Sequence, residues 1–243
     1  MIELAAVVPH PPLLVPELAG GAAAETAPLR AGCESAANRL VAAGVVDWLA
    51  VAADPSGPRR VPPSAAGTFA GYGVDVPVAL GARCRPAGAE ADRLPLPMLV
   101  AGWLRGRVPA DVAVTGELIA PSSPAAECAA RGRQLVEGLP GRVGLLVLGD
   151  GSSHHPAPGA GRVDERAVRF DATVRDALAT ADTAALLGLD ERLAAELDVA
   201  GRPAWQLLAG AAERAWPAWR GELLYSAAPY GVAYHVAVWR PVR

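Results

Sequence analysis

No lysine occurs in the sequence, and all 22 basic side chains are arginine. Alanine is very frequent, and both biases are typical of a GC-rich genome, so neither counts as a functional signal. Acidic residues number 25, the formal net charge is −3 and the isoelectric point is about 5.8. This balance excludes an overall basic field that would attract nucleic acid or an anionic membrane. We therefore expect neither as a partner.

Cysteine is also scarce, with only three widely separated residues, Cys33, Cys84 and Cys128. Their odd number and the absence of a CxxC pair argue against a disulfide framework or a thiolate zinc site. No apolar run reaches the ~18 residues that span a bilayer. The first residues have no basic segment and meet a proline at position 9, which is typical of a buried strand rather than a signal peptide. These features predict a cytoplasmic protein.

The sequence is rich in apolar side chains: 52% are hydrophobic and 19% are charged. This ratio excludes a disordered chain. A chain of 243 residues can bury a sizeable core. Neither an internal repeat nor a shift in composition marks a linker, so we expect a single α/β domain over residues 1–243.

Short apolar segments alternate with helix-like ones. The predicted strands are residues 2–8, 45–53, 74–80, 111–115, 144–148, 222–225 and 232–239. The predicted helices are residues 23–43, 97–106, 124–139 and 164–181, with another starting at Pro203, and residues 184–197 are predicted to form a short helix or a pair of turns. Residues 54–66 contain four prolines and are predicted to be loop. The alternation favours a layered α/β fold with a mainly parallel or mixed central sheet and helices on both faces.

The helix predicted over residues 164–181 has the clearest periodicity. Its apolar side chains recur at three- and four-residue spacing, at Ala167, Phe170, Val174 and Leu178. Arginine and aspartate are expected on the opposite face. Asp164 is a suitable N-cap.

Histidine is rare, and three of the four histidines follow predicted strands. His10 follows the first strand, and His154 and His155 follow the strand at 144–148. Asp54 follows the strand at 45–53. Ligands of open α/β sheets bind at the carboxyl ends of strands, so these side chains would converge if the strands are parallel. Imidazole and carboxylate are the ligands of mononuclear Fe(II) and Zn(II) sites.

Each of these residues also has a simpler interpretation. His10 lies among prolines that shape a tight turn, and Asp54 precedes Pro-Ser-Gly, a good turn sequence. His154 and His155 could be solvated loop residues. His235 lies within a predicted strand, where a lone histidine is more often structural.

The segment Gly-Asp-Gly-Ser-Ser-His-His after the strand at 144–148 supports further readings. Its glycine turn could hold an anion with backbone N–H groups. Ser152 or Ser153 beside a histidine suggests a hydrolase nucleophile, with Asp150 orienting the histidine. No G-x-S-x-G elbow is present.

Three segments together resemble the LigB-type class III extradiol dioxygenase superfamily, which includes the Memo-like proteins. They are VVPHPPLLVPE at the start, GLLVLGDGSSHH in the middle and LLYSAAPYGVAYHVAVW near the end. The combination is most similar to the actinobacterial branch described as subunit-B-like. The resemblance implies a LigB-like α/β fold and an oxidoreductase that opens a catechol-like ring beside its hydroxyls.

The resemblance also implies a non-haem Fe(II), or another divalent metal, held by histidines and a carboxylate. His10 corresponds to the first metal histidine. The loop of the second reads Ala-Asp-Pro-Ser-Gly, so Asp54 is the nearest candidate there. Near the end of the chain, Glu222, Tyr230 and His235 are available for the last ligand, and Glu222 is the carboxylate among them. His154, or alternatively His155, corresponds to the acid–base histidine.

Three functions from different classes remain open on these residues. The first is a dioxygenase-like enzyme with an altered metal site, acting on a small-molecule substrate. The second is a catalytically degenerate LigB-fold protein that binds a ligand without metal. The third is a serine/histidine hydrolase or phosphate-ester binder built on the glycine loop. By resemblance, the chain is expected to form a homodimer.

Overall fold

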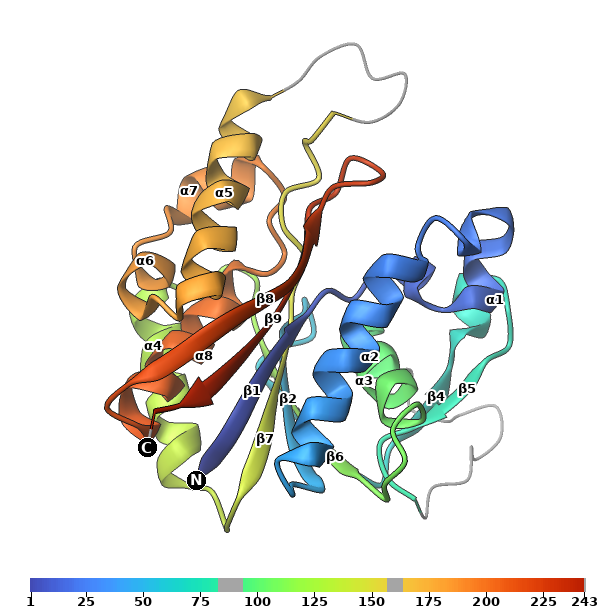
Figure 1. Ribbon diagram of the computed structural model, residues 1–243, viewed down its shortest axis with the longest axis horizontal. Helices are drawn as coiled ribbons and strands as arrows, with labels where there is room; N and C mark the ends of the chain where they lie inside the picture. Colours follow the sequence, from blue (N-terminus) through green and yellow to red (C-terminus); the bar gives the residue numbers. More distant parts are fainter. Residues whose placement is uncertain (83–93, 157–163, 243) are drawn as a thin grey trace.

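The computed structural model describes residues 1–82, 94–156 and 164–242, which form a mixed α/β fold around one large sheet (Figure 1). The order of strands in this sheet is β3-β6-β2-β7-β1-β9-β8. Their bounds are β1 Ile2–Val8, β2 Asp47–Ala53, β3 Arg59–Val61, β6 Ala113–Ile119, β7 Val143–Leu148, β8 Trp219–Ala227 and β9 Tyr234–Pro241. A separate small ladder pairs β4 (Ala66–Thr68) with β5 (Pro77–Ala79).

The centre of the sheet is parallel and its edges are antiparallel. Strand β7 pairs in parallel with both β1 and β2, and β2 pairs in parallel with β6. Strands β9 and β8 form an antiparallel hairpin against β1, and β3 is antiparallel to β6. This confirms the predicted mainly parallel, mixed sheet. It also places the carboxyl ends of β1, β2, β6 and β7 at one edge.

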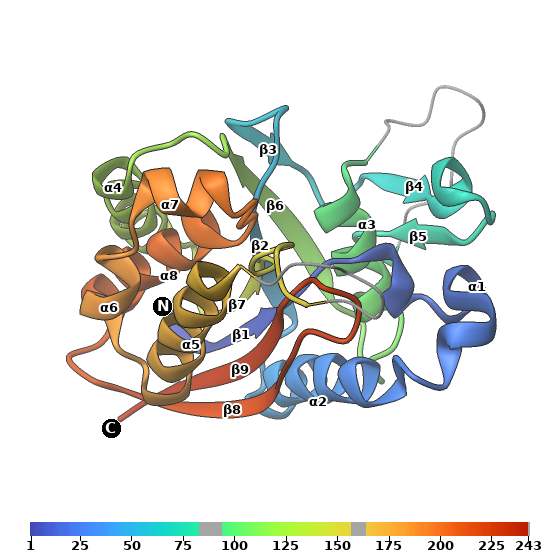
Figure 2. The same ribbon diagram turned by 90° about the horizontal axis from the view of Figure 1, so that it is seen from above.

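Helices cover both faces of the sheet (Figure 2). Their bounds are α1 Pro16–Ala19, α2 Ala27–Ala42, α3 Leu96–Arg105, α4 Ala125–Glu137, α5 Glu165–Thr180, α6 Thr183–Leu187, α7 Glu191–Glu196 and α8 Arg202–Ala215, with short 3-10 turns at Pro12–Leu14, Gly20–Ala23 and Phe69–Tyr72. Helices α2 and α3 pack on one face, around Trp48. Helices α4, α5 and α8 pack on the other, around Trp205.

Two predictions about extended segments were wrong. Residues 54–66, predicted to be loop, contain β3, which finds a partner only in distant β6. Strand β6 also runs beyond its predicted end at residue 115. Gly116 in this extension lets Met98 of α3 pack closely on the strand, because a Cβ there would lie 2.4 Å from the Met98 sulfur. The next residue, Glu117, is buried against Arg131.

Other local predictions are confirmed. The Asp164 side chain accepts a hydrogen bond from the backbone N–H of Arg166 and caps α5. Pro203 lies in the first turn of α8. Within the described parts of the chain, we find no helix long and apolar enough to cross a membrane.

Candidate functional site

His10 and the glycine loop at 149–155 meet because β1 and β7 are parallel neighbours. The backbone N–H of His10 donates to Asp150 Oδ1 at 2.8 Å. The ring Nδ1 of His10 lies 3.7 Å from the same oxygen. This nitrogen is buried and has no hydrogen-bond partner among the described residues. His10 therefore has one buried, unpaired ring nitrogen beside a carboxylate.

The negative charge of Asp150 acts on the face of the sheet that carries α2. Burial, and then this charge, raises the pKa of the Tyr234 hydroxyl. The same two causes raise the pKa of the Cys33 thiol on α2.

Asp54 does not join His10. Its carboxylate accepts the N–H of Ser56 at 2.9 Å and also the Ser56 hydroxyl, which closes its own turn. Strand β7 separates β2, which carries Asp54, from β1. The turn interpretation of Asp54 therefore explains both of these hydrogen bonds.

Glu222 is also committed elsewhere. On β8 it accepts hydrogen bonds from Arg39 of α2 at 2.6 Å and from Arg240 of β9 at 2.8 Å. The hydrogen bond from Arg39 is the main cause that lowers the Glu222 pKa. The three predicted metal ligands are thus not brought together. Over residues 1–82, 94–156 and 164–242, no cluster of three His, Cys, Asp or Glu side chains is arranged to hold a metal ion.

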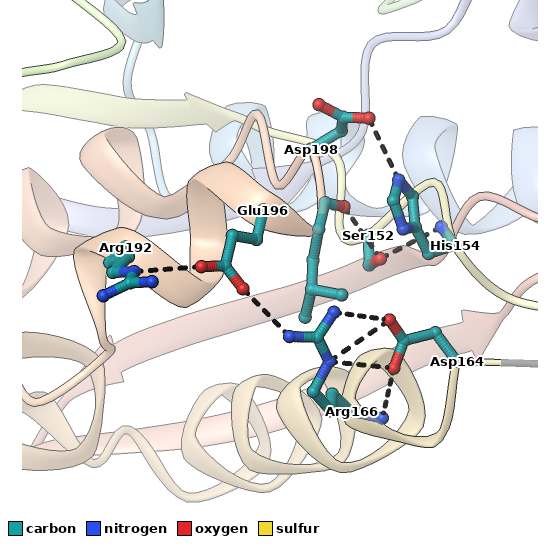
Figure 3. A network of polar contacts seen from close by, with 8 residues as sticks. Ser152, His154, Asp164, Arg166, Arg192, Glu196 and Asp198 are labelled. Carbon is teal, nitrogen blue, oxygen red and sulfur yellow. Dashed lines mark hydrogen bonds and ion pairs between the residues drawn. The ribbon is translucent and has the colours of Figure 1, made fainter.

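The two neighbouring histidines of the loop have very different surroundings. His154 lies at the surface, with Nε2 at 3.1 Å from the exposed carboxylate of Asp198. Figure 3 shows this pair beside the ion pairs of Arg166 with Asp164 and Glu196. The Ser153 hydroxyl also contacts Asp198, at 3.4 Å. Here the aspartate lies between serine and histidine, so the imidazole does not face the hydroxyl.

His155 instead faces the interior. Its Nε2 lies 2.7 Å from Oδ2 of Asp171, whose side chain is 4% exposed, while the His155 side chain is 13% exposed. On the other side of Asp171, His235 Nε2 lies 3.4 Å from Oδ1. The backbone N–H of Ser152 donates to the same carboxylate, at 3.1 Å to Oδ2. One buried carboxylate thus holds a half-buried histidine.

The prediction that the aspartates of the 164–181 helix lie on its polar face is wrong for Asp171. It follows Phe170 on α5 and is buried with the apolar residues, because three hydrogen-bonding groups compensate its charge. Gly151 makes this approach possible, since a Cβ there would lie 2.4 Å from Asp171 Oδ1. Its four-residue spacing from Ala167 is the signal that could have identified it. Asp171 was missed from the sequence.

The glycine loop uses its backbone donors within the protein. Six of its N–H groups donate to protein acceptors: Gly149, Gly151, Ser152, Ser153, His154 and His155. Ser152 is fully buried, and its hydroxyl donates to the carbonyl of Leu197 at 2.9 Å. An anion held by this turn would have to displace those bonds.

Comparison with known proteins adds little about function. No protein family matches the sequence, and no curated protein matches it. Among solved structures, the crystal structure of uncharacterized protein JW3007 from Escherichia coli K12 is similar over 98% of this chain and 99% of that chain, with 14% identity and a TM-score of 0.48. At this distance the likeness carries no argument about activity.

Proposed function

We propose that this protein is a LigB-like acid–base enzyme that binds a small catechol-like molecule at the carboxyl edge of β1 and β7. In this proposal His155 takes a proton from a hydroxyl of the ligand. The observation that carries the proposal is the 2.7 Å contact between His155 Nε2 and the buried carboxylate of Asp171.

The chemistry of the contact assigns a role to each ring nitrogen. A carboxylate only accepts hydrogen bonds, so the Nε2 of His155 carries a proton and donates it to Asp171. In the neutral ring, Nδ1 is then the basic nitrogen. When Nδ1 takes a proton from a hydroxyl, the resulting imidazolium is stabilised by Asp171. This is the arrangement that a general base requires.

His155 is favoured over His154 by burial. The carboxylate partner of His154 is 70% exposed, whereas that of His155 is 4% exposed. A solvated ion pair between flexible surface groups orients a side chain weakly. A buried, charge-assisted hydrogen bond orients it strongly. The acid–base role expected from the resemblance therefore fits His155 better.

The iron expected from the resemblance fits the described residues poorly. His10 has a buried ring nitrogen that is unpaired among the described residues, but Asp54 closes its own turn and Glu222 is held by two arginines. We therefore derive no step through a metal. Of the three functions considered from the sequence, the geometry best supports the dioxygenase-like one, and within it only the acid–base step.

The hydrolase alternative receives less support. Neither Ser152 nor Ser153 has its hydroxyl on a histidine ring, since one donates to Leu197 and the other contacts Asp198. A serine-reactive phosphonate that labelled either residue would revive this alternative.

Ultraviolet difference spectroscopy with catechol tests the proposal. Bound catechol that loses a proton to His155 gains the absorption of the catecholate, so the wild type should show this band near neutral pH. His155→Asn should bind catechol without the band, because no base accepts the proton. His154→Asn is the matched control on the adjacent residue and should keep the band.

Two results would contradict the proposal. One is a catecholate band that persists in folded His155→Asn protein. The other is wild-type protein that binds catechol without any band, or does not bind it. Circular dichroism of each variant shows whether it is folded.

A further inference from the structure

A second set of polar side chains contacts Asp171 from the β8–β9 hairpin. Ser226 of β8 and His235 of β9 are direct cross-strand partners. The Ser226 hydroxyl lies 3.0 Å from His235 Nδ1, and His235 Nε2 lies 3.4 Å from Asp171 Oδ1. Ser226, His235, Asp171 and His155 therefore form one continuous chain of side chains, which we call the Asp171 chain.

The Asp171 chain has a definite direction. Asp171 only accepts hydrogen bonds, so His235 Nε2 carries the proton that faces it. The His235 residue is 2% exposed. In the tautomer with the proton on Nε2, Nδ1 accepts a hydrogen bond, and the Ser226 hydroxyl supplies it at 3.0 Å. Trp205 packs edge-on against the ring, with centroids 6.3 Å apart, and holds it in place.

The two oxygens of Asp171 are divided between two imidazoles. Oδ1 faces His235, Oδ2 faces His155, and the backbone N–H of Ser152 donates from the third side. A buried carboxylate is stable only when such donors surround it. If the His235 donor is lost, the carboxylate is free to rotate and its hold on His155 weakens.

We propose that Ser226 and His235 are positioning residues, which orient Asp171 so that His155 presents an unprotonated Nδ1 to the ligand. This deepens the acid–base function proposed above and rests on it. Neither residue touches the reacting hydroxyl. They act only through the carboxylate of Asp171.

The test is the nitrogen NMR spectrum of the histidine rings at neutral pH without ligand. In the wild type, the two ring nitrogens of His155 should have widely separated shifts, one protonated and one not. In His235→Phe this separation should shrink, because His155 populates both tautomers. Ser226→Ala should change it in the same direction by less. Ser226→Thr keeps a hydroxyl and should restore the wild-type spectrum.

The outcome that overturns the inference is a folded His235→Phe protein with unchanged His155 shifts. If His235→Phe does not fold, the pair Ser226→Ala and Ser226→Thr decides: equal spectra for both overturn the inference. The shifts of His154, which lies outside the chain, should stay constant in all variants. Since no ligand is present, this result is separate from the catechol experiment, and a failure of the positioning inference can be distinguished from a failure of the acid–base function.

Discussion

Asp171 lies on the apolar face of α5, where a lone carboxylate would destabilise the fold. Taking a charge out of water costs several kcal/mol in real proteins unless partners compensate it, on the order of the total stability of a domain. Here His155, His235 and the N–H of Ser152 surround it. A residue kept at such cost on a core face, next to a half-buried histidine, is a candidate for function rather than packing.

The cysteines give a prediction at the same scale. Burial raises the pKa of Cys128 from 9.0 to about 11, and it raises that of Cys33 further. The thiolate is the reactive form of cysteine. At pH 8 the fraction of Cys128 present as thiolate is therefore about a hundredfold lower in the folded than in the unfolded protein. Iodoacetamide should therefore alkylate Cys128 about a hundredfold more slowly in native than in denatured protein, and Cys33 more slowly still.

Peptide mapping by mass spectrometry separates these thiols from Cys84, which lies outside the described residues. Equal alkylation rates of Cys128 in native and denatured protein would show that its thiol is not buried as described.

Single residues of the site were predictable only where local sequence carried the signal. His10, His154 and His155 follow strands, so their place at the carboxyl edge follows from a parallel sheet. Nothing local distinguishes His154 from His155, because the difference comes from Asp198 and Asp171, which are distant in the sequence. The partners of Glu222 are equally distant, which is why its arginines were not foreseen.

At the scale of elements, prediction worked where periodicity and capping agree. Helix α5 shows both an apolar repeat and the Asp164 cap, and its observed bounds are Glu165–Thr180. Prediction failed where a strand is defined only by its hydrogen bonds to a strand distant in the sequence. Strand β3 has three residues among prolines, and only its ladder with β6 defines it. Such short edge strands carry no pattern of their own.

The start of α5 has a predictable dependence on pH. The side chain and the backbone N–H of Arg166 lower the Asp164 pKa from 3.8 to about 2. A carboxyl group whose pKa is lowered by folding stabilises the folded state fully at pH values above its pKa in the unfolded chain. This contribution disappears as the pH falls through its pKa in the folded protein. Asp164→Asn keeps the cap but removes the charge. It should be less stable than wild type at pH 7, and the difference should shrink below pH 4.

Urea denaturation of both proteins across this range measures the difference. A stability difference that is independent of pH would contradict the ion pair of Asp164 with Arg166.

At the scale of the whole molecule, the parallel centre of the sheet creates the site. It brings the ends of β1 and β7 together, and the β8–β9 hairpin adds His235 from the end of the chain. The α/β class and the mixed sheet were predictable from alternating segments. The position of the hairpin beside β1 was not, because antiparallel closure depends on contacts across the whole chain.

The most direct test of this account is a crystal structure with catechol bound. The account predicts a ligand at the carboxyl edge of β1 and β7, with a hydroxyl oxygen within about 3 Å of His155 Nδ1. A ligand seated elsewhere, or one whose hydroxyls contact His154 and leave His155 free, would contradict it.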